Sequence, residues 1–164
     1  MTRAVLSIGS NLGDRLAHLR TAVDVLRPWL VAASTVVETP PWGPVEQPSY
    51  LNAVLVVDDP AAAPADWLAR AHEAEQRADR TREVRWGPRT LDVDVVAVTG
   101  PDGEIRSDDP VLTLPHPRSR ERAFVLVPWL DVDPDARIGD DAVADLLARL
   151  TDDTTARPGL ELVP

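Results

Sequence analysis

The chain has 164 residues, 44% of them hydrophobic, which is enough for one core, and residues 1–164 are expected to form a single domain. A formal net charge of −10 argues against a nucleic-acid-binding surface, because such surfaces need an excess of Lys and Arg. The chain has no cysteine, which excludes disulfides and zinc–thiolate sites, and no apolar run long enough for a signal peptide or a membrane span. We therefore expect a soluble, cytoplasmic protein with no nucleic-acid or membrane partner.

Lysine is also absent, so the cationic side chains are all arginines. This excludes a P-loop lysine, a kinase-type strand lysine and a Schiff base. The arginines are dense in two windows, residues 77–89 and 118–122. In an acidic chain, such local basic density suggests a small polyanionic ligand.

Hydrophobic patterning predicts four strands and two helices in the first hundred residues. The strands are expected at residues 3–8, 31–37, 50–57 and 91–98. The first helix follows the turn at 9–14, and the second begins at Pro64, which suits the first turn of a helix. The predicted order is therefore β-α-β-β-α-β.

This order favours an α+β, ferredoxin-like βαββαβ fold, in which both helices pack on one face of an antiparallel sheet. The other face is then free for ligands. Additions are expected after it: a short strand following the Asp102-Gly103 turn, a short segment at 124–130, and an amphipathic helix around 141–150. The tail at 151–164 is weakly patterned.

The most informative stretch runs from Arg85 to Val96, where Asp92 and Asp94 interrupt an apolar, β-branched run. Two residues of strand span about 7 Å and return to the same face, so the two carboxylates are near enough to share divalent cations. A solvated strand face is the alternative interpretation. Against it, two Asp side chains on one face repel each other unless something positive lies between them, and arginines precede them in the sequence.

Four segments make the chain resemble the 6-hydroxymethyl-7,8-dihydropterin pyrophosphokinase family over nearly its whole length. They are Gly9-Ser10-Asn11-Leu12-Gly13-Asp14, the stretch from Thr39-Pro40-Pro41-Trp42-Gly43-Pro44 to Gln47-Pro48-Ser49-Tyr50-Leu51-Asn52-Ala53, residues 85–96, and Pro115-His116-Pro117 running to Arg122-Ala123-Phe124. The resemblance implies transfer of a pyrophosphoryl group from ATP, the co-substrate, to the hydroxymethyl group of a reduced pterin. The products would be AMP and the pterin diphosphate, in folate biosynthesis.

The resemblance also implies a role for individual residues. Asp92 and Asp94 would ligate magnesium, with two Mg²⁺ ions in the site, and Arg80, Arg82 and Arg89 would stabilise charge in the transition state. Phosphoryl transfer depends on such positioning and charge stabilisation. The implied nucleotide contacts are Glu75, Arg80, Arg82, Trp86, Arg89, Thr113, His116 and Arg122. The implied pterin contacts are Thr39, Pro40, Trp42, Tyr50, Asn52, Asp92 and Phe124.

Several of these residues also have a purely structural interpretation. Tyr50 and Phe124 could clamp a flat bicyclic ring, or could simply belong to the core. Asn52 is harder to explain structurally, because an amide is poor strand material unless it binds something. His116 sits between two prolines, and a lone histidine is more often structural than catalytic. The segment 9–13 lacks a phosphate-loop pattern and is interpreted as a strand-to-helix turn that shapes the site.

Two other functions remain open at this point. The same carboxylates on an open sheet could serve a two-metal nucleotide hydrolase or nucleotidyltransferase, which would release ADP or free pyrophosphate. A noncatalytic ferredoxin-like sensor would bind ligand without turnover. We also expect the segments 39–48 and 79–88 to move and close over bound substrates, and the chain to act as a monomer.

Overall fold

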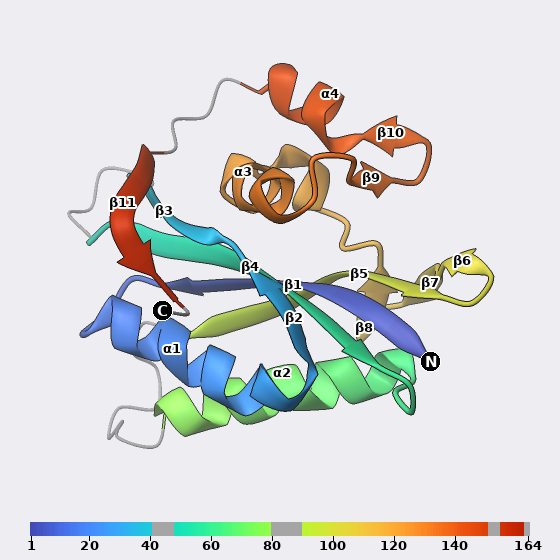
Figure 1. Ribbon diagram of the computed structural model, residues 1–164, viewed down its shortest axis with the longest axis horizontal. Helices are drawn as coiled ribbons and strands as arrows, with labels where there is room; N and C mark the ends of the chain where they lie inside the picture. The colour runs from blue at the N-terminus through green and yellow to red at the C-terminus, as the bar shows by residue number, and fades with distance from the viewer. Residues whose placement is uncertain (41–47, 80–89, 151–154, 163–164) are drawn as a thin grey trace.

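The computed structural model describes residues 1–40, 48–79, 90–150 and 155–162, and for 155–161 it describes the backbone alone. Its centre is an antiparallel sheet in the order β11-β3-β4-β1-β5-β6, with β2 also pairing with β4 (Figure 1). The strands of this sheet are β1 (Thr2–Ser10), β2 (Leu30–Ala33), β3 (Thr35–Thr39), β4 (Tyr50–Asp59), β5 (Asp92–Gly100), β6 (Gly103–Glu104) and β11 (Thr155–Glu161). Residues from both ends of the chain therefore share one sheet.

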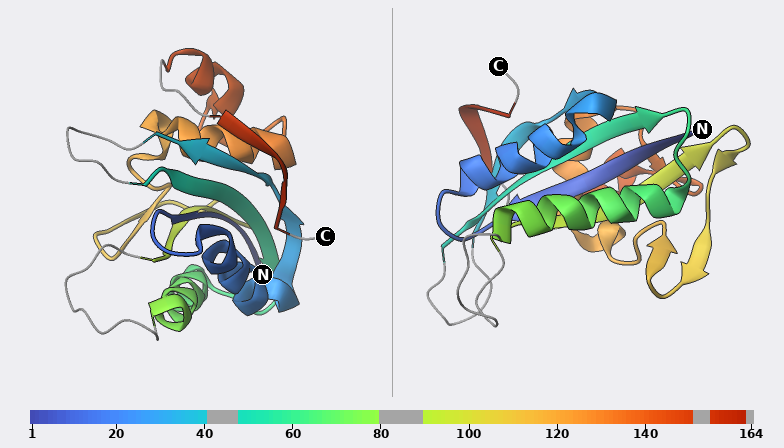
Figure 2. Two further views of the ribbon diagram at one scale, coloured as in Figure 1. Left: turned by 90° about the vertical axis from the view of Figure 1, so that its left-hand side faces the viewer. Right: turned by 90° about the horizontal axis from the view of Figure 1, so that it is seen from below.

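Helices lie on both faces of this sheet (Figure 2). On one face α1 (Arg15–Leu26) and α2 (Pro64–Asp79) lie side by side, and on the other α3 (Ala123–Val132) packs against β3 and β4, with α4 (Val143–Ala148) outside it. The remaining elements are the 3-10 helices Arg27–Trp29 and Ser119–Glu121 and the small hairpins β7 (Ser107–Asp109)–β8 (Leu112–Leu114) and β9 (Arg137–Ile138)–β10 (Asp141–Ala142).

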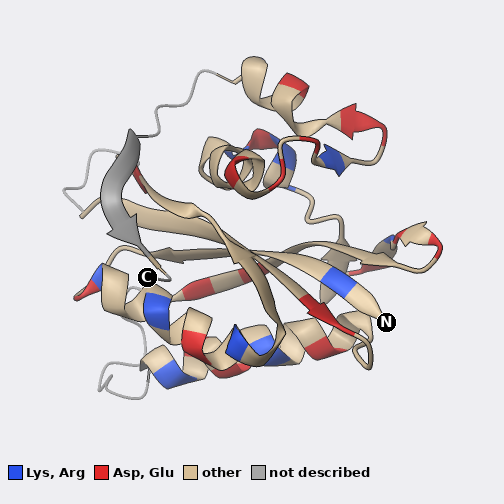
Figure 3. Ribbon diagram, in the orientation of Figure 1, with Lys and Arg blue, Asp and Glu red and all other residues tan. Residues whose placement is uncertain are grey.

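Charged residues lie mainly on the helices and outer hairpins, and the middle of the sheet carries few of them (Figure 3). Within the described ranges, every helix is too short or too polar to cross a membrane.

The predicted βαββαβ order is confirmed, and the four central strands stand in the order β3-β4-β1-β5. The expectation that the second face is free for ligands was wrong in part, because α3 packs on that face against β3 and β4. The strand expected at 31–37 was wrong as one element, because Ser34 separates β2 from β3. The Ser34 side chain replaces a regular ladder contact: its Oγ accepts from the Val54 N–H at 2.9 Å, while its own N–H donates to the Val54 carbonyl at 2.9 Å. The N–H and carbonyl of Val54 and the N–H and hydroxyl of Ser34 are therefore all hydrogen-bonded despite the break.

The segments after β5 are more regular than expected. The short segment expected at 124–130 lies within α3, and the extra strand after Asp102-Gly103 is β6. The helix expected at 141–150 is shorter, because β10 occupies 141–142 and α4 ends at Ala148. The tail, which showed little pattern, contributes β11 along β3.

Two layers of apolar side chains hold the sheet to its helices. Beneath α1 and α2, alternate residues of β1 are fully buried, namely Ala4, Leu6 and Ile8. On the other face, Leu126 and Trp129 of α3 pack on a second cluster with Val54. Each such Leu or Ile contributes about 1.5–3 kcal/mol of burial free energy, so the two layers fix the sheet from both sides.

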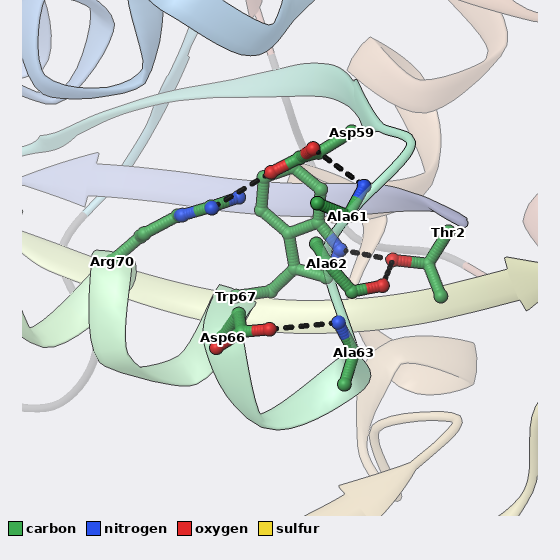
Figure 4. Close-up of polar contacts among 8 residues, drawn as sticks. All are labelled: Thr2, Asp59, Ala61, Ala62, Ala63, Asp66, Trp67 and Arg70. Carbon is green, nitrogen blue, oxygen red and sulfur yellow. Dashed lines mark hydrogen bonds and ion pairs between the residues drawn. The ribbon is translucent and has the colours of Figure 1, made fainter.

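Trp67 of α2 anchors that helix to the start of β1 (Figure 4). Its side chain is fully buried, and its indole N–H donates to the Thr2 hydroxyl at 2.8 Å. The Thr2 hydroxyl in turn donates to the Ala62 carbonyl at 2.9 Å. A buried indole N–H without a partner would be costly, so this pair of hydrogen bonds explains how the large ring is accommodated.

Arg70 extends the same cluster (Figure 4). Its guanidinium carbon lies 3.7 Å from the Trp29 ring centroid and 4.7 Å from that of Trp67, and its Nη2 donates to Asp59 Oδ2 at 2.8 Å. Asp59 Oδ1 also accepts from the Ala61 N–H at 2.8 Å. These two donors, the backbone N–H first and Arg70 second, lower the pKa of Asp59 below its ordinary value.

We expect Asp59→Asn to lower the thermal unfolding midpoint at neutral pH, and this deficit to shrink in acid. The folded-state pKa is depressed, so the stability from the ionised carboxylate is present above the ordinary pKa and is lost as the pH falls through the folded value. Thermal unfolding of both proteins from about pH 7 to about pH 3 measures this difference. Asp24→Asn, which breaks an exposed ion pair with Arg27, is the control. A deficit that stays constant with pH would contradict the assignment.

Candidate functional site

A row of residues crosses the four central strands on the face opposite α1 and α2. The register pairs Val37 of β3 with Asn52 of β4, Asn52 with Gly9 of β1, and Gly9 with Asp92 of β5. Alternate residues of a strand share a face, and the neighbours Ile8, Leu51 and Val93 lie in the core under the two helices. The side chains of Asn52 and Asp92 therefore rise from the other face, two strands apart, with a glycine between them.

Gly9 allows the side-chain amide of Asn52 to lie against the β1 backbone. A Cβ built there would lie 2.6 Å from Asn52 Oδ1, closer than real side chains come. With strands spaced about 4.8 Å apart, the backbones at Asn52 and Asp92 stand about 10 Å apart, with the β1 backbone between them. We refer to this part of the sheet face, which has an amide on one side and a carboxylate on the other, as the slot.

The amide side of the slot is fixed by neighbouring residues of the β3–β4 ladder. Asn52 is 4% exposed, and its Nδ2 donates to the Thr39 hydroxyl at 2.7 Å. Tyr50 is paired with Thr39 and lies on the same face as Asn52. Burial, and then the charge of Asp92, raise the pKa of the Tyr50 phenol, so it stays protonated at neutral pH and can donate. Pro40 follows β3 and is exposed.

The carboxylate side of the slot continues to Asp94, one alternate position along β5. Asp94 pairs with Ser7 of β1 and so shares the face of Asp92. Arg122, just before α3, brings Nη1 to 3.8 Å from Asp94 Oδ2, and its guanidinium carbon lies 5.6 Å from the ring centroid of Phe124. At 3.8 Å, with the Asp94 side chain 45% exposed, the ion pair is loose, and both charges can interact with a ligand.

His116 is held beside this pair by the backbone. Its N–H donates to the Val96 carbonyl of β5 at 2.8 Å, and its Nδ1 accepts from the Arg118 N–H at 3.3 Å. Burial is the main cause that lowers the pKa of His116; Asp94 opposes it, and Arg122 and Arg118 add to it. The ring is therefore neutral near pH 7, and an Nδ1 that accepts leaves its proton on Nε2.

Glu75 contacts the strand that carries the carboxylates, whereas Thr113 lies in the β7–β8 hairpin. Glu75 reaches from α2 to the edge of β5, where its Oε2 accepts from the N–H of Val93, between the two Asp residues, at 3.3 Å. This contact is structural support for the strand that carries them. The Thr113 hydroxyl donates within its own hairpin, to the Asp109 carbonyl at 3.0 Å.

The residues present fit a divalent cation that a ligand helps to bind. Among the described residues there is no group of three His, Cys, Asp or Glu side chains able to hold a metal by itself. Asp92 and Asp94 provide two partly exposed carboxylates on one face. Magnesium is usually held in this way, by one or two carboxylates together with substrate phosphates and water.

The structure thus brings together Asp92, Asp94, Arg122 and His116 on one side and Thr39, Tyr50 and Asn52 on the other. Five further predicted site residues lie outside the described residues: Trp42, Arg80, Arg82, Trp86 and Arg89. The same holds for most of the segments 39–48 and 79–88 that are expected to close. Gly9 was not predicted as a site residue, although a glycine inside a strand is itself a signal of close approach.

We expect His116 to titrate below the ordinary histidine pKa of 6.5 in metal-free buffer. Arg122→Gln should raise this pKa because it removes a nearby positive charge, and Asp94→Asn should lower it further because it removes a negative one. Imidazole NMR resonances followed against pH, assigned with His116→Gln, measure both shifts. A wild-type value at or above 6.5, or a downward shift in Arg122→Gln, would be incompatible with this geometry.

Comparison with known proteins identifies the family of the chain. A family model described as 7,8-dihydro-6-hydroxymethylpterin-pyrophosphokinase (HPPK) matches residues 5–134. The chain is 54% identical to the 2-amino-4-hydroxy-6-hydroxymethyldihydropteridine pyrophosphokinase of Mycobacterium tuberculosis H37Rv over 143 residues, covering 84% of this chain and 76% of that protein. It is 43% identical to the protein of the same name from Methylorubrum extorquens over 154 residues, covering 92% and 94%.

Among solved structures, the fold is similar to a Plasmodium falciparum HPPK-DHPS A437G chain, with a TM-score of 0.68 and 13% identity. The match covers 90% of this chain but 45% of that longer one, so the chain spans less than half the length of this structural relative. At this identity the similarity concerns the fold alone. The family match and the curated relatives are decisive: the chain belongs to the 7,8-dihydro-6-hydroxymethylpterin-pyrophosphokinase family.

Proposed function

We propose that the chain transfers the pyrophosphoryl group of ATP to the hydroxymethyl group of 6-hydroxymethyl-7,8-dihydropterin in folate biosynthesis. The products are AMP and the pterin diphosphate. Family membership supports this reaction, with ATP as the co-substrate. A two-metal hydrolase or nucleotidyltransferase is not favoured, because it would have no use for the amide side of the slot.

One observation carries the proposal. Asn52 and Asp92 face each other across Gly9, and Asp94 extends the acidic side toward Arg122. A pterin is flat and carries hydrogen-bonding groups along its edge, so it suits a sheet face where Gly9 adds no side chain of its own and where an amide can both donate and accept. If the ring edge binds Asn52, the hydroxymethyl group on the other side of the ring would lie beside the carboxylates. The phosphorus atom that it attacks would have to bind at the same place.

Asp92 and Asp94 would hold two magnesium ions. When bound, these ions neutralise the triphosphate and lower the barrier for the attacking hydroxyl. Asp92 also borders the pterin slot, so the same side chain would orient the acceptor alcohol. Placing the acceptor next to the nucleotide is the main contribution the protein makes in phosphoryl transfer.

The nucleotide would lie on the side of β5 that carries Arg122 and His116. Arg122 is only loosely bound to Asp94 and can donate to phosphate oxygens, and neutral His116 can donate from Nε2. Further contacts are proposed from the family resemblance, with Arg80, Arg82 and Arg89 stabilising charge on the transferred group. The remaining nucleotide contacts proposed in this way are Glu75, Trp86 and Thr113.

The pterin would lie on the β4 side of the slot. Asn52, whose amide is hydrogen-bonded to Thr39, would form hydrogen bonds with the ring edge. Tyr50 keeps its phenolic proton, because its pKa is raised, and can donate a hydrogen bond to the ring. Phe124 is the second residue of α3, on the same side of the sheet, and would supply an aromatic face. Pro40 and Trp42 are proposed to complete this side.

The proposal concerns one chain acting as one domain. β1 and β11, from opposite ends of the sequence, belong to the same sheet, which supports a single pyrophosphokinase domain over residues 1–164. The residues proposed for both substrates belong to this one domain, so a monomer would suffice for the proposed reaction. The use of ATP as co-substrate supports a cytoplasmic location.

The reaction is tested by product analysis. We expect the purified chain, supplied with ATP, Mg²⁺ and 6-hydroxymethyl-7,8-dihydropterin, to form AMP and pterin diphosphate in equal amounts. Asp94→Asn should reduce kcat roughly 100- to 1000-fold while the protein stays folded, because a group that stabilises transition-state charge is lost.

Asp102→Asn, an exposed carboxylate in the β5–β6 turn, is the matched control and should keep wild-type turnover. Release of ADP or free pyrophosphate would favour the hydrolase or nucleotidyltransferase, and no turnover would favour a sensor. A fully active Asp94→Asn protein would remove the carboxylate pair from the mechanism.

A further inference from the structure

A chain of hydrogen bonds on the reverse face of the sheet joins three elements around the pterin side of the site. Arg15 is the first residue of α1, and its Nη1 donates to the Ser49 carbonyl at 2.8 Å and to the Ser49 Oγ at 3.1 Å. The Ser49 hydroxyl then donates to Glu38 Oε1 of β3 at 2.7 Å. We refer to these three residues as the Arg15–Ser49–Glu38 latch.

The latch cannot be a direct contact for substrate in the slot. Glu38 pairs with Leu51, and both belong to the strand positions that face α1, where Leu51 is buried in the core. Thr39 and Asn52 occupy the alternate positions and face the slot. The latch and the slot thus lie on opposite sides of the same two strand ends.

The latch connects α1 to the end of the short β3–β4 ladder. In the described residues this ladder has three pairs, Val37–Asn52, Glu38–Leu51 and Thr39–Tyr50. Glu38 sits in the middle pair, and Ser49 directly precedes Tyr50. Holding both against the start of α1 fixes the tilt of the strand ends relative to β1, and therefore the position of Asn52 over Gly9.

The hydrogen bonds of the latch run in one direction, from Arg15 through Ser49 to Glu38. A hydroxyl can accept one hydrogen bond while it donates another, so Ser49 bridges a guanidinium and a carboxylate that do not need to touch. Both bonds involve a charged partner and all three side chains are partly buried, which makes them stronger than neutral surface contacts.

We propose that Arg15, Ser49 and Glu38 are positioning residues for the pterin half of the site, an inference that rests on the proposed function. They hold Thr39, Tyr50 and Asn52 in the arrangement that binds the ring. The nucleotide half is attached elsewhere, to β5 and to the segment that carries His116 and Arg122. Loss of the latch therefore weakens pterin binding and leaves ATP binding intact.

The test compares Michaelis constants for the two substrates. Arg15→Ala is expected to raise the KM for the pterin about 10-fold, because the binding-competent arrangement becomes a minor population. The KM for ATP and kcat should stay within about twofold of wild type. Arg27→Ala, which removes an exposed arginine ion pair at the far end of α1, is the matched control and should change neither constant.

Two substitutions at Ser49 separate positioning from general stability. Ser49→Ala should reproduce the effect of Arg15→Ala, and the double variant should be no worse than either single one, because all three remove the same unit. Ser49→Thr keeps the hydroxyl and should restore the pterin KM to near wild type. Unfolding midpoints measured alongside show whether any variant is simply destabilised.

Equal rises in both KM values, an unchanged pterin KM in Arg15→Ala, or no rescue by Ser49→Thr would overturn the inference. Its failure differs from failure of the proposed function. If wild-type protein makes no pterin diphosphate, the function itself is wrong. If wild-type protein is active but Arg15→Ala and Ser49→Ala bind pterin as tightly as it does, in calorimetry with a nonhydrolysable ATP analogue present, only the latch is wrong.

Discussion

The antiparallel pairing of β4, β1 and β5 is the constraint on which the rest of the structure depends. Its register sets Asn52, Gly9 and Asp92 in one row, and the two-residue period sends their neighbours into the core beneath α1 and α2. A slip of one residue in β5 would bury both carboxylates under the helices and expose Val93 and Val95 instead. The hydrophobic core therefore specifies the site, because the register that buries the apolar residues also presents the polar ones.

Polar groups in the middle of a sheet need hydrogen-bond or charge partners, and the two sides of the slot have partners of different kinds. Asn52 is satisfied within the protein by Thr39, so its amide stays oriented before any ligand arrives. Asp92 and Asp94 occupy alternate positions on the same face of β5, and Arg122 approaches Asp94 at 3.8 Å. Two carboxylates arranged in this way favour a bound cation. The acidic side therefore reaches its final arrangement only when its ligands bind, whereas the amide side is already oriented in the free protein. Residues that hold the amide in place therefore matter on the pterin side, and metal ligands matter on the acidic side.

Local patterns were sufficient for much of the fold and for one half of the site. The alternation of Asp92 and Asp94 with valines predicts their common face, and the order of strands and helices predicts the ferredoxin-like sheet. Long-range pairing was not predictable in this way: that Gly9 lies opposite both Asn52 and Asp92 depends on register between strands more than forty residues apart. The break at Ser34, the addition of β11 and the Arg15–Ser49–Glu38 latch depend likewise on contacts between distant segments. The roles of Arg80, Arg82 and Arg89, which lie between α2 and β5, remain predictions, because these residues lie outside the described ones.

The central claim is that the pterin lies between Asn52 and Asp92, whose spacing depends on Gly9, and Gly9→Ala tests it most directly. The added methyl group would meet Asn52 Oδ1 at 2.6 Å, so the amide must turn away from Thr39 or the slot must narrow. Gly100→Ala is the control, since its methyl would come closest to the end of the flexible Ile105 side chain, at 3.2 Å, and Gly100 lies at the opposite end of β5 from Asp92. Steady-state kinetics of the two folded variants should show the KM for the pterin raised roughly 10-fold or more in Gly9→Ala alone, with the KM for ATP unchanged in both. A folded Gly9→Ala protein with a wild-type pterin KM would contradict the account.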